Sequence, residues 1–284
     1  MSDSQSFGTW EAAVEWLRSQ PAQRQLVLDC YYDDPLTDSA ERYWRGEEWR
    51  AAREALGQGR GPVLEVGAGR GIVSFALAKD GRDVVALEPD SSDLVGCGAI
   101  ARLAGQTGLP IRVVKGRSES LPFADGSFDT VVARAALHHA ADLDRFCAEC
   151  FRVVRPGGRF MALREHVVSH ARDVARFQDR HPLHRLYGGE FAYTLDRYVG
   201  ALRAAGFQRI DVLKPWQSPM NTAPRSLERL RDEVGARVDR MLPGAGALLR
   251  RLLSNRILWS SGLKTLNALD RRPGRLFTFI GHRS

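Results

Sequence analysis

The sequence predicts an α/β protein whose core is a seven-stranded, mostly parallel sheet with helices on both faces. From residue 61 to about residue 207, short apolar segments alternate with segments of helical periodicity. This alternation is typical of parallel strands that are buried between helices. The expected strands are residues 62–67, 83–89, 111–116, 128–134, 158–166, 209–214 and 275–282.

Helical periodicity fills the segments between and around these strands. The helices expected within the core are residues 71–80, 93–105, 142–154 and 194–207. Two more helical patterns, at 9–19 and 39–56, precede the sheet, and apolar residues recur at helical spacing from 227 to 269. The predicted division of the chain is an N-terminal helical lid (1–60), a core (61–214), and a helical cap with the final strand (215–284).

Composition excludes several classes of protein. The chain has 284 residues, of which 44% are hydrophobic and 26% charged, so it has enough apolar material for a globular core. Its longest stretch without Asp, Glu, Lys or Arg runs only from Pro215 to Pro224, whereas a membrane-spanning helix needs about 20 apolar residues. The N-terminus lacks the basic start and apolar run of an export signal. We therefore expect a cytoplasmic protein without a transmembrane segment.

The number of cysteines also fits a cytoplasmic protein. Four cysteines in so long a chain do not form a disulfide framework, and a reducing environment suits them. Cys147 and Cys150 form a CxxC pair, but they lie in a helical pattern with no second pair nearby. We interpret them as inert helix positions and expect no metal site.

Positive charge is concentrated at the C-terminal end. Residues 225–284 contain thirteen Arg or Lys and five Asp or Glu, a balance of +8, so residues 1–224 carry about −1 of the formal +7. Such a balance indicates either an anionic partner, such as nucleic acid, a membrane surface or a phosphorylated substrate, or a solvated helical face. Both interpretations stay open at this point.

The strongest motif is a glycine-rich turn. Residues 63–71 read VLEVGAGRG, a buried strand that leads into three glycines and then into a helix. Glycines let the backbone turn tightly beside a ligand, and the helix N-terminus offers unpaired N–H groups. Strand two ends in Glu88, as a dinucleotide site would. The dinucleotide fingerprint GxGxxG, however, requires glycine where the chain has Ile72, so the GxGxG spacing argues against a nicotinamide enzyme.

Residues 62–166 resemble class I S-adenosylmethionine-dependent methyltransferases, specifically the small-molecule group related to quinone-biosynthesis methyltransferases. The five motifs that match in order are EVGAGRG at 65–71, ALEPD at 86–90, SESLPFADGSFD at 118–129, RAALHHAADLD at 134–144, and RVVRPGGRFMALREH at 152–166. The resemblance implies a Rossmann-like fold, S-adenosyl-L-methionine as the cofactor and methyl transfer as the activity. It does not extend to the flanking helices, which give no indication of the substrate.

The resemblance also implies roles for residues that would bind the donor. Gly67, Gly69 and Gly71 would form the floor under the methionine portion. Glu65, inside the strand ahead of them, would hold the ammonium group directly or through water. Glu88, at the carboxyl end of strand two, would accept hydrogen bonds from both ribose hydroxyls.

The adenine end departs from the family pattern. Where many relatives have Gly-Asp ahead of the LPF segment, this chain has Gly116 and Arg117. The adenine contact is therefore expected to shift to Ser118, Glu119 or a backbone group. Arg134 ends strand four, where relatives use backbone atoms to hold the methionine end of the donor, and its side chain is expected to cap the site.

Histidines follow strand four at the position where donor and acceptor should meet. In an open α/β sheet, ligands bind outside the carboxyl ends of the strands. His138 and His139 are therefore the candidate catalytic residues, because a neutral imidazole can accept a proton from a hydroxyl as it is methylated. The alternative is that one or both pack structurally.

Candidate substrate residues come from strand five and the segment after it. His166 lies at the carboxyl end of strand five, and Tyr187 and Glu190 belong to the stretch 181–190, which fits either a mobile flap or a plain loop. Tyr31 and Tyr32 are candidates for closing the cofactor site from the N-terminal side.

The function predicted from these features is methylation of a small-molecule or glycan-type acceptor, on oxygen, with carbon and nitrogen left as open alternatives. No Asn/Asp-Pro-Pro-Tyr follows strand four, which argues against the group of methyltransferases that methylate amino groups of nucleic acids. A second hypothesis is a cofactor-binding protein of the methyltransferase fold whose basic helical tail binds RNA or an anionic membrane surface. The sequence does not predict an oligomeric state.

Overall fold

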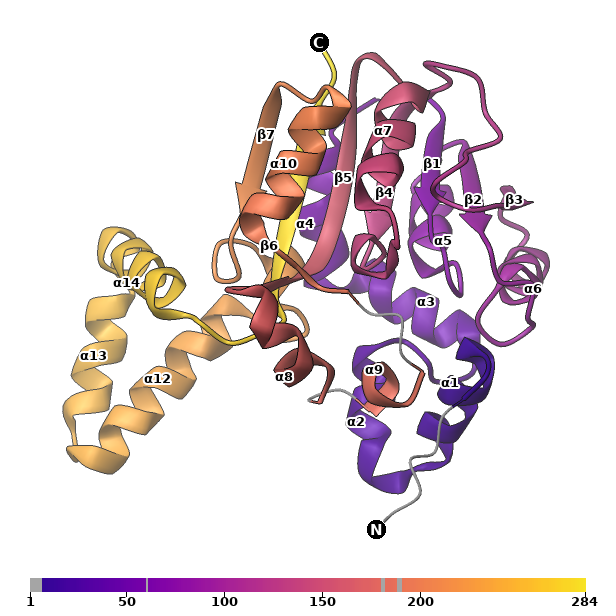
Figure 1. The fold of residues 1–284 in the computed structure, drawn as a ribbon. Coiled ribbons are helices and arrows are strands. Elements are labelled where there is room, and N and C mark those ends of the chain that lie inside the picture. The colour runs from indigo at the N-terminus through magenta and orange to yellow at the C-terminus, as the bar shows by residue number, and fades with distance from the viewer. Residues whose placement is uncertain (1–6, 60, 180–181, 188–190) are drawn as a thin grey trace.

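The computed structural model describes the chain except for residues 1–6, 60, 180–181 and 188–190 (Figure 1). Among the described residues, eight strands form one sheet in the order β3-β2-β1-β4-β5-β8-β7, with β6 paired to β5. The seven expected strands are β1 (Val63–Val66), β2 (Val84–Glu88), β3 (Ile111–Lys115), β4 (Phe128–Arg134), β5 (Val154–Val168), β7 (Arg209–Leu213) and β8 (Arg275–His282). The predicted α/β fold is therefore confirmed.

Strand direction explains where a ligand can bind. Strands β3, β2, β1, β4 and β5 run parallel to their neighbours, and β8 runs antiparallel to both β5 and β7. The strand order reverses between β1 and β4, and the crevice outside the carboxyl ends of such a pair is the usual ligand site of an open α/β sheet.

Two details of the sheet differ from the sequence prediction. Strand β5 begins at Val154 instead of residue 158, because a register shift lets Val154 pair with Phe128 before Arg159 pairs with Thr130. Strand β6 (Tyr193–Thr194) was not expected, since two residues are too few to give a periodic pattern. It pairs in parallel with the last two residues of β5, Val167 and Val168.

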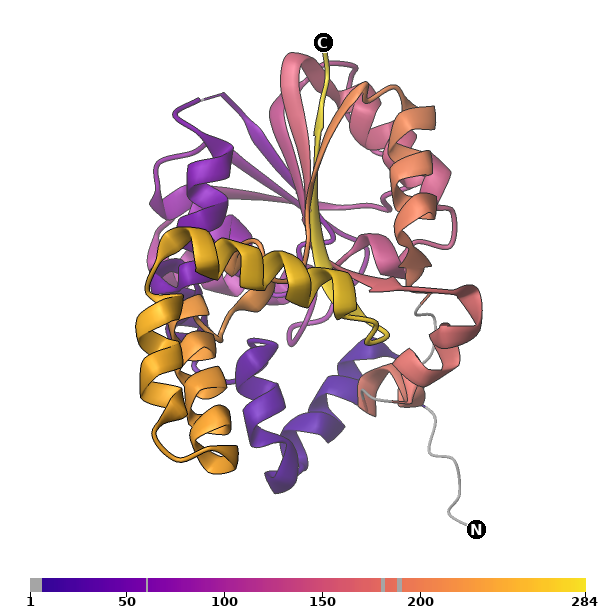
Figure 2. The same cartoon turned by 90° about the vertical axis from the view of Figure 1, so that its left-hand side faces the viewer.

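Helices cover both faces of the sheet (Figure 2). Helices α7 (Leu143–Val153) and α10 (Leu195–Ala205) pack in one apolar cluster with β4 and β5. Helices α3 (Leu36–Arg45), α4 (Glu47–Leu56), α5 (Ile72–Lys79) and α6 (Cys97–Thr107) share the cluster on the other face. This two-sided burial explains the nearly continuous apolar runs of the central strands.

Helix α7 contains the CxxC pair. Cys147 and Cys150 are both fully buried in the apolar cluster on that face, with no disulfide. Burial raises the pKa of the Cys147 thiol to about 12, so this thiol stays protonated and unreactive at neutral pH.

Short helices lie beyond the carboxyl ends of the strands (Figure 1). They are α1 (Trp10–Ser19), α2 (Arg24–Asp29), α8 (Val174–Gln178) and α9 (Pro182–Tyr187). Leu183 of α9 is buried against Val14 and Leu17 of α1, so the N-terminal helices and the segment after β5 form one apolar cluster. The stretch 181–190, expected to be a flap or loop, thus contains a helix.

Three further helices are inserted before the last strand, as expected. They are α12 (Leu227–Met241), α13 (Ala245–Leu253) and α14 (Arg256–Leu269), and they follow the short α11 (Pro219–Thr222). Figures 1 and 2 show them as an arm that projects to one side of the sheet. Asp270, just after α14, and Asn267 in α14 accept hydrogen bonds from Trp216 at 3.1 and 3.0 Å, which fixes the arm to the core at its base.

The three-part division of the chain stays a prediction. Within the expected lid, α1 and α2 lie beyond the carboxyl ends of the strands, whereas α3 and α4 pack on one face of the sheet. The last strand returns to the sheet. Within the described part of the chain, no helix combines the length and apolar character needed to cross a bilayer.

Candidate functional site

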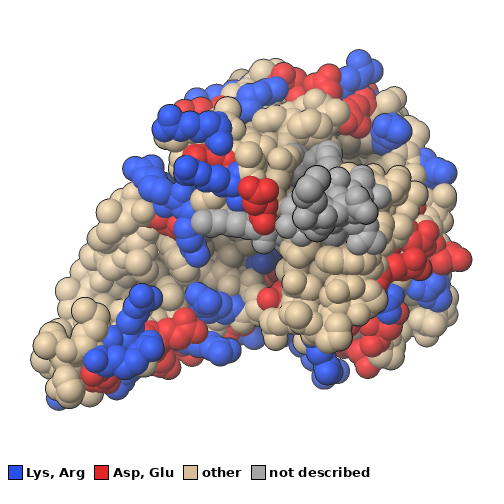
Figure 3. Space-filling view, turned by 60° about the horizontal axis from the view of Figure 1, so that its bottom comes forward, with Lys and Arg blue, Asp and Glu red and all other residues tan. Residues whose placement is uncertain are grey.

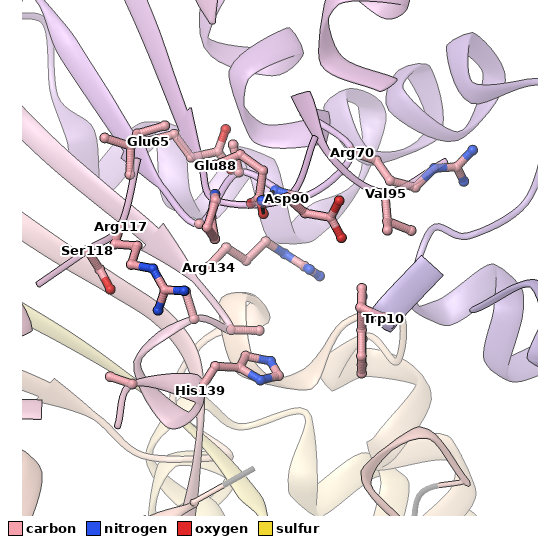
Figure 4. A pocket seen from close by; sticks show the side chains of 18 of the residues that line it. Trp10, Glu65, Arg70, Glu88, Asp90, Val95, Arg117, Ser118, Arg134 and His139 are labelled. Carbon is pink, nitrogen blue, oxygen red and sulfur yellow. Dashed lines mark hydrogen bonds between the residues drawn. The ribbon is translucent and has the colours of Figure 1, made fainter. Parts of the chain in front are cut away.

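The glycine-rich turn after β1 is closed by the carboxylate of Glu88 (Figure 4). The Gly69 N–H donates to Glu88 Oε2 at 2.7 Å, and the Asp90 N–H donates to Oε1 at 3.0 Å. Gly67 has a φ of +71°, and a Cβ there would lie 2.9 Å from the Ala136 side chain, so only glycine fits. Burial raises the pKa of Glu88 although both N–H groups favour its charged form.

Glu65 lies within β1, one residue before the end of that strand. It is fully buried, and the Ser74 hydroxyl from α5 donates a hydrogen bond to it. Burial raises the pKa of Glu65 to about 8, although the Ser74 hydrogen bond and the Arg134 charge oppose the rise, so its carboxyl group is mostly protonated at neutral pH.

The turn after β4 carries the two candidate catalytic histidines. Ala135 has a φ of +51°, and Leu137–His139 form a single 3₁₀ turn. The N–H groups of this turn point at one buried carboxylate, that of Glu165 in β5. The N–H donors and their distances to Glu165 are Ala136 at 3.1 Å, Leu137 at 3.2 Å and His138 at 3.2 Å.

Glu165 also contacts the His138 ring. The distance from His138 Nδ1 to Glu165 Oε2 is 2.9 Å, and both side chains are almost completely buried. Burial raises the pKa of Glu165 to about 6, while the three backbone N–H groups limit that rise. The carboxylate therefore fixes both the backbone of the turn and the orientation of the His138 ring.

His139 faces the opposite way, into a cavity. Its side chain is exposed to solvent, and its ring lies edge-on to Trp10 with ring centres 5.8 Å apart. Partial loss of surrounding water and, secondly, the nearby His138 lower the pKa of His139. The imidazole is therefore neutral at physiological pH.

The cavity has a volume of about 670 Å³ and lies outside the carboxyl ends of β1, β2 and β4. One part is lined by Glu65, the turn at 67–70, Glu88 and the segment 117–119. The other part is lined by His139 and by aromatic side chains that come from the N-terminal helices and from the segment after β5, namely Trp10, Tyr32, Tyr187 and Phe191. Its volume is within the range of small-molecule sites.

Arg134 joins the cavity wall to the N-terminal helices. Its guanidinium donates two hydrogen bonds to Glu48 of α4, from Nε at 2.6 Å and from Nη2 at 3.0 Å. It also lies over the rings of Tyr31 and Tyr43, 5.3 and 5.4 Å from their centres. Burial opposes the charge of Arg134, but the buried Glu48 raises its pKa, so the guanidinium stays protonated.

Most of the predicted site residues lie together. The predicted residues that line the cavity are Glu65, Gly67, Gly69, Glu88, Ser118, Glu119, Arg134, His139 and Tyr187, together with Tyr31 and Tyr32. Ser118 donates a hydrogen bond to Glu119 at 2.9 Å. Their roles in binding stay predictions.

Other predicted residues do not line the described cavity. Gly71, with a φ of +79°, precedes α5 as its N-cap and packs against Ile100. His138 is buried behind His139. His166 contacts the His138 ring, and its Nδ1 lies 2.9 Å from the Gly274 carbonyl. Glu190 lies outside the described residues.

Several residues of the site were missed by the sequence analysis. Trp10 lines the cavity, but nothing in its helical pattern distinguishes it from a core residue. Arg70 is 4% exposed and donates to the carbonyl oxygens of Tyr31 and Asp33, each at 2.9 Å. Its place inside the EVGAGRG motif is the feature of the sequence that could have identified it. Glu165 could only be found from the structure, because its partners lie 27 to 29 residues away.

Comparison with known proteins identifies a domain within the chain and solved structures of the same fold. Residues 64–162 match a family described as "Methyltransferase domain". An uncharacterized methyltransferase from Mycobacterium sp. (strain JLS) is 39% identical over 110 residues, which are 39% of this chain and 40% of that protein. Demethylmenaquinone methyltransferase from Beutenbergia cavernae is 37% identical over 131 residues, 45% of this chain and 50% of that protein.

A solved structure extends the likeness over nearly the whole chain. A SAM-dependent methyltransferase from Thermotoga maritima, described as a possible histamine N-methyltransferase, aligns with a TM-score of 0.52 and 15% identity. The alignment covers 97% of this chain and 100% of that one. At this identity the likeness shows the fold alone.

Residues 64–162 thus carry a methyltransferase domain, and the proteins that match part of the chain include a quinone-biosynthesis methyltransferase. The matches span about half the length of the curated relatives. The reaction and acceptor of the whole chain are therefore taken up below as proposals.

The position of Glu88 generates a first prediction. We expect Glu88→Ala to weaken binding of S-adenosylmethionine roughly 10- to 150-fold, because a charge-assisted hydrogen bond contributes about 1.5–3 kcal/mol. Calorimetric titration measures the change. Glu54→Ala, which removes an exposed carboxylate from α4, is the matched control and should bind normally. Unchanged affinity in Glu88→Ala would remove this residue from the donor site.

The raised pKa of Glu65 generates a second prediction. Below pH 8 its carboxyl group is largely neutral, and a bound ammonium would favour the carboxylate, so donor binding should release a proton. Affinity should therefore rise with pH up to about 8 and then level off. Titration calorimetry in two buffers of different ionisation enthalpy measures the proton release directly.

The control for this effect is Glu65→Gln, which cannot ionise. It should bind the donor more weakly and release no proton as it does so. Equal proton release by the wild type and Glu65→Gln would show that another group titrates.

Glu165 generates a third prediction. Glu165→Ala would leave three buried N–H groups without their acceptor, which should lower the free energy of unfolding by about 3 kcal/mol. Urea denaturation measures the change, and Glu54→Ala should alter stability by less than about 0.5 kcal/mol. A similarly small effect in Glu165→Ala would mean that the turn finds other acceptors.

Proposed function

We propose that the chain transfers the methyl group of S-adenosylmethionine to an oxygen atom of a small-molecule or glycan-type acceptor. The observation that carries this proposal is that one cavity of about 670 Å³ contains both the predicted donor residues and His139 with its aromatic neighbours. A donor and a small acceptor can therefore be held side by side, out of bulk water.

The residues at the polar end fit the donor. The Glu88 carboxylate, now paired with the Gly69 and Asp90 N–H groups, has further lone pairs for a ribose diol. Gly67 and Gly69 leave room for close approach of the ligand to the backbone, and Glu65 can balance an ammonium group. The donor supplies an already activated methyl group, so the protein needs to contribute mainly positioning.

The residues at the other end fit an acceptor that has a ring or an apolar body. Trp10 contacts Tyr187 edge to face with ring centres 5.3 Å apart, and Tyr32 lies 6.4 Å from Trp10. Aromatic side chains bury flat or sugar-like rings with little loss of conformational entropy. The charged residues that line the described cavity include the acids Glu65, Glu88, Asp90 and Glu119, which disfavour a nucleic-acid backbone.

His139 is suited to receive the proton of an acceptor hydroxyl. As the new C–O bond forms and the donor C–S bond breaks, the acceptor oxygen becomes strongly acidic. The neutral imidazole can then take its proton, even though the lowered pKa makes His139 a weak base towards a free hydroxyl.

The sequence hypothesis that the tail binds RNA or a membrane concerns a different part of the chain and does not exclude methyl transfer.

Isotope transfer tests the proposal. The full chain is incubated with methyl-labelled S-adenosylmethionine and three separate acceptor sets: phenols and polyols, amines, and activated carbon acids. We expect label in the hydroxyl set, recovered as ethers. Label only in the amine or carbon set would reject methylation on oxygen, and absence of donor binding by calorimetry would reject the enzyme proposal as a whole.

The position of His139 generates a fourth prediction. His139→Gln should lower the rate at saturating substrate about 10²–10⁴-fold and leave donor affinity nearly unchanged. His138→Gln should have a smaller effect on the rate, because its ring is buried behind His139 and contacts Glu165. His282→Gln, at the far end of β8 beside Asp211, is the matched control.

The pH dependence of the methyl-transfer rate tests the role of His139 as a base. His139 acts as a base only while neutral, and its lowered pKa keeps it neutral below the pH at which an ordinary histidine becomes protonated. The wild-type rate at saturating substrate should therefore show no acidic limb near pH 6.5, the usual histidine value. A limb there that vanishes in His139→Gln would contradict this account of the imidazole.

A further inference from the structure

The helical arm formed by α12, α13 and α14 (residues 227–269) exposes an unusual amount of apolar surface. In the described part of the chain, seven of the nine exposed large hydrophobic side chains belong to this arm. They are Met241, Leu242, Leu248, Leu252, Ile257, Leu258 and Leu269. The other two, Tyr187 and Phe191, line the cavity. Exposed apolar surface gathered on one element marks an interaction site in a soluble protein.

These side chains are distributed over all three helices of the arm. Met241 and Leu242 end α12 at the tip of the α12–α13 hairpin, and Met241 is 77% exposed. Leu248 and Leu252 are one helical turn apart and share one side of α13. Ile257, 76% exposed, begins α14.

Cations accompany the apolar side chains. Residues 227–269 contain eight Arg or Lys and four Asp or Glu, a balance of +4. Arg251 stands next to Leu252 and one turn from Leu248, and Lys264 lies two turns after Ile257 on the same side of α14. Neither cation has a carboxylate partner within 4 Å among the residues that the structure describes.

We propose that this arm binds the surface of an anionic lipid bilayer, with its apolar side chains in the headgroup region and its cations on lipid phosphates. Figure 3 shows the arm at the lower left, with charged groups along one edge and uncharged atoms over much of its visible face. Helices that combine aliphatic side chains with Lys and Arg lie in the membrane interface in this way. The attachment is peripheral, since no described helix can cross the bilayer.

The observations favour a membrane over two other occupants. RNA is bound mainly through cations and aromatic stacking, whereas the exposed apolar residues of the arm are aliphatic. A second copy of the chain would bring two surfaces of charge +4 together, and their repulsion opposes self-association. An anionic bilayer can bury the aliphatic side chains and can also pair the cations with lipid phosphates.

Co-sedimentation of the full chain with vesicles tests the proposal. One set of vesicles contains phosphatidylglycerol and phosphatidylcholine in equal parts, and the other contains phosphatidylcholine alone. We expect binding to the anionic vesicles, weakened by added salt, and little binding to the neutral ones.

Two pairs of exposed substitutions identify the surface. Arg251→Gln with Lys264→Gln should weaken binding to anionic vesicles roughly 30-fold, from about 1 kcal/mol for each cation near the surface. Leu248→Gln with Leu252→Gln should weaken it at least about tenfold through lost apolar burial. The control is Arg112→Gln with Arg203→Gln, which removes the same charge from exposed positions in β3 and α10 and should bind normally. Thermal melts confirm that each variant is folded.

Three results would overturn the proposal. The first is equal binding to anionic and neutral vesicles, or none to either. The second is normal anionic binding by both arm variants. The third is that a different partner occupies the arm. Light scattering would then show a dimer that the Leu248 and Leu252 substitutions dissociate, or the chain would bind single-stranded RNA tightly and not bind vesicles. None of these results depends on the methyl-transfer proposal, because the assay uses neither donor nor acceptor.

Discussion

The carboxylate of Glu165 is the constraint on which the shape of the site depends. A tight turn after β4 places three N–H groups in the protein interior, where no water can satisfy them. Glu165, one strand away in β5, accepts all three and also orients the His138 ring. As a result, β5 determines where the turn after β4 can lie. His139 therefore projects into the cavity from a backbone that is held by the sheet.

Two buried arginines connect this framework to the N-terminal helices. Arg70 leaves the glycine-rich turn and donates to backbone carbonyls at Tyr31 and Asp33. Arg134 leaves β4 and forms a two-bond ion pair with Glu48, which is itself buried. Removing either member of such a pair would leave a buried charge uncompensated. The N-terminal part of the chain is thus tied both to the glycine-rich turn and to β4.

The sequence predicted the sheet and the donor end of the site because both depend on local patterns. Buried strands give apolar runs, and the turn at 67–71 has glycines wherever the backbone takes a positive φ. The rest depends on tertiary contacts that local patterns do not encode. Trp10 reaches the cavity only because α1 packs against α9, and Glu165 is recognisable only once β4 and β5 are adjacent. Gly71 and His138 are neighbours in the chain of residues that line the described cavity, but neither of them lines it.

The central claim is that donor and acceptor share the cavity between the glycine-rich turn and His139. A crystal structure of the chain with S-adenosylhomocysteine, the demethylated product, tests it most directly. We predict the ribose hydroxyls within hydrogen-bond distance of Glu88, and the sulfur atom facing the part of the cavity lined by His139 and Trp10. Density for the ligand outside this cavity, or a sulfur atom directed away from His139 towards the sheet, would contradict the account.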